Sequence, residues 1–264
     1  MLSPELLDKY LQRIKLTTEL TVSRELLIEI HQAHLANIPF ENIDITLGKP
    51  IELSEDVILK KVLDDNRGGF CYELNFALYL LLSAIGFNVT LLSARVFNGS
   101  GYGKEYDHLL LLVDLDGEQI IVDVGFGDSF QLPFSINGSV HKESTGFYKV
   151  NDNEDVYTLW KSLDDKDWLP LYIFTSTPRK LAEFEDMCVH QQTSSESNFT
   201  KGMVCTVPVE NGRKTLSGNK MITTIDGVRT EQTIDNEALF YQLLNNTFGI
   251  ELNDDAMVFS KFNT

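Results

Sequence analysis

The sequence predicts an α+β fold in which a helical N-terminal part is followed by antiparallel strands. Up to Gly86, apolar residues recur at helical spacing after residues that commonly begin helices. From Phe87 onward the apolar period changes to two, and polar or Asp-rich turns separate short strands. The succession of short strands indicates a small antiparallel barrel.

The N-terminal part is expected to hold a series of capped helices. Ser3, Ser23 and Ser54 are each placed to cap the start of one helix, and a proline follows the first of them directly. A further helix is expected to begin at Cys71 and to end at Gly86, which can adopt the left-handed conformation of a C-cap.

The strands and the C-terminal helices are expected in a regular order. The predicted strands of the barrel are residues 87–97, 107–114, 118–126, 146–150, 156–160 and 168–174. A helix over residues 180–189 is followed by strands near 202–209, 214–216, 220–225 and 228–232, and by a helix over 236–245.

Cys71 is the first candidate for chemistry, because it lies at the start of an apolar helix within Arg67-Gly-Gly-Phe-Cys71-Tyr-Glu-Leu-Asn75. Unpaired backbone N–H groups and the positive end of the helix dipole favour a thiolate there. Arg67 is expected to add positive charge, and Glu73 to complement the dipole and to pair with Arg67. A lone cysteine in an apolar helix is more often a core residue, so Cys71 needs partners to be read as a nucleophile.

A predicted hairpin supplies these partners. If Asp116 and Gly117 form its two-residue turn, Leu115 faces Glu118, and the same register places Asp123 diagonally beside His108 on one face. A carboxylate in an apolar strand is costly without a partner. Cysteine, histidine and aspartate then match the roles of nucleophile, base and orienting group.

These motifs resemble the arylamine N-acetyltransferase family. The matching pieces are His34-Leu-Ala-Asn-Ile-Pro-Phe40-Glu-Asn-Ile-Asp44, the Cys71 motif, His108 with its leucine run, Val122-Asp123-Val-Gly-Phe126-Gly127, and Ser197-Asn-Phe199-Thr200 followed by Met203-Val-Cys205. They are spread over most of residues 1 to 210.

The resemblance implies three domains and a mechanism. The domains are a helical bundle (1–86) carrying the nucleophile, a β-barrel (87–190) carrying His108 and Asp123, and an α/β lid (191–264), with a cysteine-protease-like Cys-His-Asp core. Acetyl-CoA is implied to acetylate Cys71, after which an arylamine or arylhydrazine accepts the acetyl group. The implied contacts are Phe40 and Phe126 for the acceptor, and Gly127, Phe199 and Thr200 for acetyl-CoA.

The net charge of the chain limits the classes of partner that it is expected to bind. The 264-residue chain carries a net charge of -17, which argues against nucleic acid and also opposes the anionic acetyl-CoA. Lys104, Arg179, Lys180 and Lys201 are candidate sources of local positive charge, although a single surface charge of this kind is more often simply solvated. Asp128 is a candidate for favouring acceptors with a cationic or hydrogen-bond-donating substituent.

The remaining features bear on compartment and on rival functions. No apolar stretch approaches the length of a membrane span, the N-terminus lacks the pattern of a signal peptide, and three cysteines at no metal-like spacing suit a reducing compartment. A cytoplasmic protein without a metal or a membrane partner is therefore expected. The rival functions are a Cys-His-Asp thiol hydrolase, a transglutaminase-like acyltransferase, and a binding domain that has lost activity.

Overall fold

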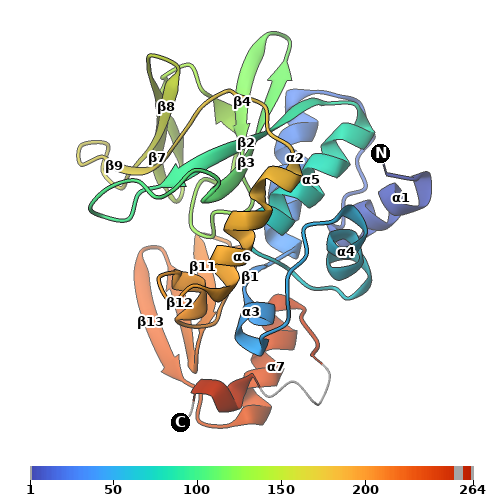
Figure 1. The fold of residues 1–264 in the computed structure, drawn as a ribbon, viewed down its shortest axis with the longest axis vertical. Helices are drawn as coiled ribbons and strands as arrows, with labels where there is room; N and C mark the ends of the chain where they lie inside the picture. The colour runs from blue at the N-terminus through green and yellow to red at the C-terminus, as the bar shows by residue number, and fades with distance from the viewer. Residues whose placement is uncertain (1, 253–257, 263–264) are drawn as a thin grey trace.

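The computed structural model describes residues 2–252 and 258–262 and has helices around two antiparallel sheets (Figure 1). The helices are α1 (Pro4–Arg13), α2 (Arg24–Asn37), α3 (Ile43–Leu47), α4 (Glu55–Leu59), α5 (Cys71–Ile85), α6 (Glu185–Thr193) and α7 (Glu237–Phe248), with a π-helical turn over Lys60–Asp64 and 3-10 turns over Leu181–Phe184, Asn198–Thr200 and Phe259–Phe262. Among these described residues, no helix combines the length and the apolar character that crossing a membrane requires.

The N-terminal helices begin where the sequence predicts. The hydroxyls of Ser3 and Ser23 accept hydrogen bonds from backbone N–H groups in the first turns of α1 and α2. Ser54 lies at the N-cap of α4, and Gly86 ends α5 with a φ of 109°. The helix α3 was not predicted, because its five residues are too few for a helical period to be visible in the sequence.

The larger sheet has eight strands in the order β5-β4-β3-β2-β9-β8-β7-β6. Its strands are β2 (Asn88–Val96), β3 (His108–Leu115), β4 (Glu118–Val122), β5 (Phe134–Ser135), β6 (His141–Glu143), β7 (Gly146–Asn153), β8 (Val156–Ser162) and β9 (Leu169–Phe174). The edge strands β5 and β6 approach each other, since the rings of Phe134 and His141 stack with centroids 4.8 Å apart. The sheet is thus a nearly closed barrel, as the sequence predicts.

The strand β3 joins the barrel to the helices because both of its faces are buried. Leu109 and Leu111 pack into the core that the helices form, whereas Leu110 and Leu112 pack into the barrel interior. The continuous leucine run is therefore a strand with two apolar sides rather than an amphipathic one. His108 shares the barrel side with Leu110, which places it at the end of the barrel interior nearest α5.

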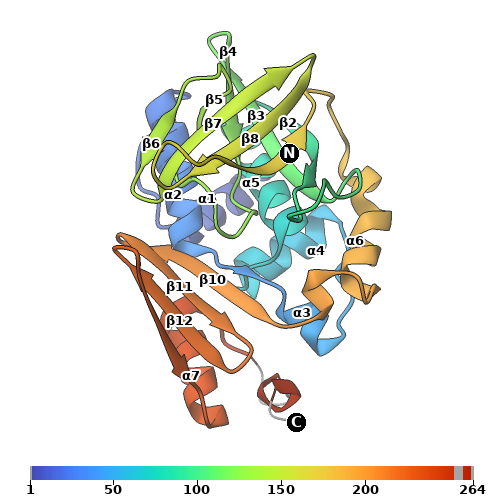
Figure 2. The same ribbon diagram turned by 90° about the vertical axis from the view of Figure 1, so that its left-hand side faces the viewer.

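The smaller sheet has five strands in the order β1-β10-β11-β12-β13. They are β1 (Phe40–Glu41), β10 (Val204–Val209), β11 (Gly212–Ser217), β12 (Lys220–Ile225) and β13 (Val228–Thr233). One face packs against α7 (Figure 2). Leu216 and Met221 of that face lie in the same core as Phe240 and Leu244 of α7. The opposite face of this sheet lines the cleft described below.

Segments on either side of the predicted domain boundaries share hydrophobic cores. The strand β1 from the N-terminal part extends the C-terminal sheet, and Ile43 of α3 packs in the core beneath that sheet. Phe184 and Cys188, in and before α6, pack with the N-terminal helices instead. The three-domain division at residues 86 and 190 stays a prediction, while the site lies where these layers meet.

Candidate active site

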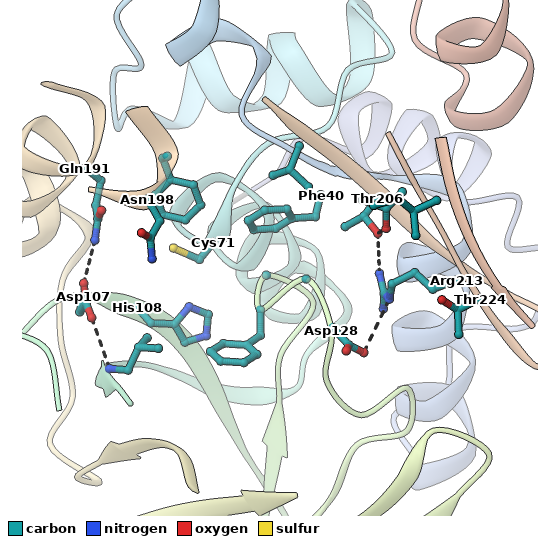
Figure 3. Close-up of a pocket in the computed structure, with 18 of the residues that line it drawn as sticks. Phe40, Cys71, Asp107, His108, Asp128, Gln191, Asn198, Thr206, Arg213 and Thr224 are labelled. Carbon is teal, nitrogen blue, oxygen red and sulfur yellow. Dashed lines mark hydrogen bonds and ion pairs between the residues drawn. The ribbon is translucent and has the colours of Figure 1, made fainter. Parts of the chain in front are cut away.

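Cys71 is the first residue of α5 and is buried, with 3% of its surface exposed. Gly125 packs directly against it: a Cβ placed on Gly125 would lie 2.6 Å from the Cα of Cys71. Only a glycine allows the chain after β4 to pass this closely, so the β4 end and the helix start are held together. Figure 3 shows the Cys71 sulfur facing the same pocket as the His108 ring.

The predicted hairpin register is confirmed. Asp116 and Gly117 form the turn with positive φ values of 54° and 80°, and Leu115 pairs with Glu118. His108 Nε2 lies 2.8 Å from Asp123 Oδ2, and both side chains are almost fully buried. Because Nε2 is engaged with Asp123, Nδ1 is the imidazole nitrogen left to exchange a proton with a neighbour.

Four donors surround the Asp123 carboxylate. Oδ1 accepts hydrogen bonds from Asn75 Nδ2 and the Gly125 N–H, each at 2.9 Å. Oδ2 accepts from the Tyr172 hydroxyl at 2.9 Å, in addition to His108. Burial by itself raises the pKa of the Asp123 carboxyl, but His108 and these donors hold that pKa below its usual value. The group is therefore an ionised acceptor at neutral pH.

Asn75 ties this carboxylate to the helix that carries the cysteine. Its Nδ2 also donates to the Leu109 carbonyl at 2.6 Å, and its Oδ1 accepts the Val124 N–H at 2.9 Å. The amide thus bridges α5, β3 and the end of β4 one helical turn after Cys71. A residue in this position keeps the nucleophile and the His108–Asp123 pair in one rigid frame.

The Cys71 thiol needs a proton acceptor at its side. Burial raises the pKa of the thiol well above its usual value, a hydrogen bond from the Leu109 backbone opposes the rise, and the negative charge of Asp123 adds to it. An isolated thiolate is therefore unfavourable here, so the thiol needs a neighbouring base, and His108 in the same cleft is the candidate.

Arg67 and Glu73 do not pair with each other, contrary to the sequence prediction. Arg67 Nη2 lies 2.7 Å from Glu41 Oε1, and Glu73 Oε1 lies 2.7 Å from Lys61 Nζ. Lys61 also lies 2.7 Å from Asp44 Oδ2. The prediction was wrong because Lys61, on the π-helical turn, is a nearer cation than Arg67 in the folded chain. Since Glu41 already neutralises Arg67, the positive charge expected beside Cys71 is not free to act on the thiol.

This cluster of ion pairs fixes the start of α5. The other oxygen of Glu73 accepts the Phe70 N–H at 3.1 Å, which caps the helix immediately before the cysteine. Both Glu73 and Lys61 are buried. The cluster is thus a structural support for the nucleophile rather than a part of the chemistry.

A cleft of about 640 Å³ opens over Cys71 and His108 (Figure 3). One side holds Asp107, whose Oδ1 accepts a 2.7 Å hydrogen bond from Gln191 Nε2. The opposite side holds Arg213 and Asp128. Other lining residues are Phe40, Val96, Gly125, Phe126, Gly127, Asn198, Phe199, Val204, Thr206, Thr215, Ile222, Thr224 and Arg229.

Most of the sequence-predicted contact residues come together in this cleft. Phe40, Phe126, Gly127 and Phe199 all line it. The Phe126 ring meets the His108 ring at a centroid distance of 5.3 Å, so it lies directly beside the base. Thr200 does not line the cleft. Its hydroxyl donates instead to the carbonyls of residues 194 and 197.

The cations expected to offset the acidic charge lie elsewhere. Lys104, Arg179, Lys180 and Lys201 do not line the cleft. Arg179, for example, pairs with Glu105 at 3.3 Å. The lining cations are Arg213 and Arg229, on β11 and β13. Arg213 lies just before the strand predicted at residues 214–216, and that prediction did not indicate which residues its faces would meet.

A buried Cys-His-Asp set at the base of a cleft defines a thiol enzyme of the acyl-transfer or hydrolase type. Among the described residues, no cluster of His, Cys, Asp or Glu could hold a metal ion.

Comparison with known proteins gives the family. The model of the N-acetyltransferase family matches residues 24–257. The arylamine N-acetyltransferase of Mycolicibacterium smegmatis is 32% identical over 258 residues, covering 95% of this chain and 94% of that protein. The structure of arylamine N-acetyltransferase from Salmonella typhimurium superposes with a TM-score of 0.90 at 27% identity and covers 99% of this chain and 100% of that one.

A third relative was solved with a ligand. The Mycobacterium marinum arylamine N-acetyltransferase in complex with CoA matches with a TM-score of 0.84 at 26% identity, covering 92% of each chain. The protein described here belongs to the arylamine N-acetyltransferase family and is an acyltransferase.

Proposed function

We propose that the protein transfers an acetyl group from acetyl-CoA to an arylamine or arylhydrazine through an acetyl-Cys71 intermediate. The observation that carries this proposal is the placement of Cys71, at the start of α5, in the same cleft as the buried His108–Asp123 pair. The family membership and the CoA complex of the M. marinum relative support acetyl-CoA as the donor.

In the first half-reaction, His108 Nδ1 takes the proton of Cys71 and the sulfur attacks the thioester carbonyl of acetyl-CoA. Asp123 stabilises the imidazolium and keeps Nε2 protonated, because its Oδ2 accepts that hydrogen. The tetrahedral intermediate collapses when CoA leaves as a thiol, with the proton that His108 returns. Backbone N–H groups at the start of α5, including that of Cys71, are the proposed donors to the oxyanion.

In the second half-reaction, the amine attacks the carbonyl of acetyl-Cys71. His108 Nδ1 accepts the proton that the amine nitrogen loses, and Cys71 leaves as the thiolate of the ion pair. The product is an acetylated amine, and the enzyme returns to its starting state. Thioester exchange is close to thermoneutral, so the intermediate retains the activation that the amine needs.

In this proposal, different residues of the cleft contact the acceptor and acetyl-CoA. Phe40 and Phe126 form the wall for an aromatic acceptor, since both rings line the cleft and Phe126 touches His108. Gly127 and Phe199 remain proposed contacts of acetyl-CoA. Thr200 remains one only through its backbone, because its hydroxyl is used within its own turn.

The cellular compartment of the protein and the class of its partners are also proposed. Cys71, Cys188 and Cys205 are free thiols in the structure. A working thiol is maintained in a reducing compartment, which supports the cytoplasm as the site of action. The acidic charge of -17 supports small-molecule partners rather than nucleic acid.

Steady-state kinetics test the order of the two half-reactions. Initial rates measured against acetyl-CoA at several arylamine concentrations are expected to give parallel double-reciprocal lines, and the acetylated amine is expected to account for the thioester consumed. Thioester loss at the same rate without an amine, with free acetate as the product, would instead identify a hydrolase. Intersecting lines would show that both substrates must bind before CoA leaves.

A further inference from the structure

The start of β3, which carries His108, is paired with a neighbouring strand on one side only. Ala94 of β2 pairs with His108, whereas the pairing of β3 with β4 begins at Leu111 and Val122. Within the described residues, His108 therefore has a ladder partner on β2 and none on β4. The residues directly before His108 form a turn and a bend. The position of the base thus depends on what holds this turn.

Tyr72 directly follows Cys71 in α5 and bonds to the backbone just before His108. The Tyr72 hydroxyl oxygen lies 2.8 Å from the carbonyl oxygen of Tyr106 and 3.3 Å from that of Asp107. Because a hydroxyl carries one hydrogen, Tyr72 donates chiefly to the nearer Tyr106 carbonyl. The side chain is buried, and burial raises the pKa of its hydroxyl well above the usual value. The group therefore remains a hydrogen-bond donor at neutral pH.

Tyr106 has a left-handed backbone with a φ of 65°, which is unfavourable for a residue with a large side chain. Hydrogen bonds hold the peptide groups on both sides of its α-carbon. The Tyr106 N–H donates to the hydroxyl oxygen of Ser93 at 2.8 Å, and the Tyr106 carbonyl accepts from Tyr72. Ser93 lies in β2 and is buried. The strained conformation is thus clamped from α5 and from β2.

The side chain of Tyr106 is anchored separately from its backbone. Its ring meets the Phe184 ring edge-on at a centroid distance of 5.2 Å, and its hydroxyl lies 3.2 Å from Glu183 Oε1. The Arg179 guanidinium lies 5.3 Å from the centroid of the Tyr106 ring. These contacts place the side chain against the 3-10 turn before α6, whereas the two backbone hydrogen bonds fix the peptide groups that lead to His108.

Resting on the function proposed above, we propose that Tyr72 is a positioning residue for the catalytic base. Its hydroxyl holds the strained Tyr106 peptide and so fixes where the His108 ring lies relative to the thiol. Loss of the hydroxyl frees this peptide to relax from the left-handed conformation, and His108 moves with it. The cost falls on proton transfer from Cys71 rather than on substrate binding, because Tyr72 does not line the cleft.

A buried tyrosine hydroxyl also needs a hydrogen-bond partner for stability alone. Two observations go beyond that need. The acceptor carbonyl belongs to a residue with a left-handed backbone, and that residue lies just before the base. In addition, Asn75 from the next turn of α5 donates to the Leu109 carbonyl directly after the base. His108 therefore lies between two carbonyls that the nucleophile's helix holds.

Single-turnover acetylation of Cys71 over a range of acetyl-CoA concentrations separates the rate at saturation from the half-saturating concentration. Tyr72→Phe keeps the ring and removes only the hydroxyl. Its rate at saturation is expected to fall by about ten-fold, with a half-saturating concentration within about two-fold of the parent value. Ser93→Ala removes the other half of the clamp and is expected to show the same pattern. Tyr79→Phe is the matched control, because it removes a tyrosine hydroxyl further along α5 and outside the cleft, and it is expected to keep the parent rate.

The role of the strained backbone is tested by changing Tyr106 itself. Tyr106→Ala and Tyr106→Gly both remove the ring, but only glycine adopts a left-handed backbone without cost. Tyr72→Phe is therefore expected to slow acetylation by about ten-fold in the Tyr106→Ala protein and by less than about two-fold in the Tyr106→Gly protein. An equal effect of Tyr72→Phe in both proteins would show that the hydroxyl does not act through the Tyr106 backbone, and would overturn the proposal.

Two results with the single variant also overturn it. An acetylation rate equal to that of the parent in folded Tyr72→Phe would leave the hydroxyl with a role in stability alone, even if the Tm falls. A higher half-saturating concentration with an unchanged rate at saturation would indicate a contribution to substrate binding instead.

Failure of the underlying function gives a different result. If the parent protein forms no acetyl-Cys71 from acetyl-CoA, the proposed function itself fails, whereas the position of the base can still be measured. The rate at which iodoacetamide alkylates Cys71, followed against pH by peptide mass, reports how readily the thiol loses its proton. Tyr72→Phe is expected to move the midpoint of this pH profile upward, because a displaced His108 stabilises the thiolate less. A midpoint identical to that of the parent contradicts the proposal.

Discussion

Replacing Asp123 with asparagine is expected to disable the base without emptying its pocket. The carboxylate accepts from two donors on each oxygen: Asn75 and Gly125 on one, and His108 and Tyr172 on the other. An amide has one acceptor oxygen and one donor nitrogen. Whichever way it is oriented, its NH₂ group therefore meets a pair of donors.

The orientation that satisfies the Gly125 N–H, which cannot rotate away, turns the NH₂ group toward His108. The imidazole can accept from this group only if Nε2 loses its hydrogen and Nδ1 gains one. Nδ1 is the nitrogen available to Cys71, so the ring then presents a donor where a base is needed. The equivalent change in other triads costs roughly 10⁴-fold in rate, or about 5 kcal/mol of transition-state stabilisation.

The assay is the single-turnover rate of Cys71 acetylation, followed by rapid quench and intact mass for Asp123→Asn and Asp123→Glu. The glutamate variant keeps a carboxylate and is expected to retain more activity, although its extra methylene must fit where the Asp123 side chain is fully buried. Thermal unfolding checks that both variants fold. An Asp123→Asn rate within about ten-fold of the parent rate would refute the assigned tautomer and orienting role.

Three further changes probe the frame around the nucleophile. Gly125→Ala is expected to slow acetylation by roughly 10²-fold, because its Cβ would lie 2.6 Å from the Cys71 backbone and displace it; a rate equal to the parent rate contradicts this. Lys61→Met is expected to lower the free energy of unfolding in urea by about 3–5 kcal/mol, since buried Glu73 loses its 2.7 Å partner; a loss under about 1 kcal/mol would refute it. Burial lowers the pKa of His34 to about 3, below its unfolded value, so its contribution to stability is complete above about pH 6.5 and is lost as the pH falls toward 3. The free energy of unfolding of the parent is therefore expected to fall by about 2 kcal/mol between pH 8 and pH 5 because of His34. In urea unfolding, His34→Leu is expected to lack this part of the fall. The same pH dependence in both proteins would contradict the prediction.

The catalytic pairing could be predicted because it depends on local rules. The turn at Asp116 and Gly117 sets the register of the β3–β4 hairpin, and the period of two then places His108 beside Asp123. The position of Cys71 at a helix start follows likewise from the apolar spacing after it and from Gly86. None of these inferences requires knowledge of how distant parts of the chain pack.

The contacts that sequence reasoning missed depend on such packing. Glu73 could be matched with more than one cation, and only the path of the π-helical turn brings Lys61 to it. Arg213 lies on an alternating strand, but the face that it shares with Thr215 becomes cleft-lining only because α7 covers the other face. The sequence shows the alternation and leaves open which side meets the catalytic residues.

Intact mass of the protein after brief incubation with acetyl-CoA tests the central claim most directly, with Cys71→Ala measured beside it. The account predicts that the parent gains one acetyl group, that the variant gains none, and that an added arylamine discharges the acetyl group as its amide. No adduct on the parent, or the same adduct on Cys71→Ala, would contradict transfer through acetyl-Cys71.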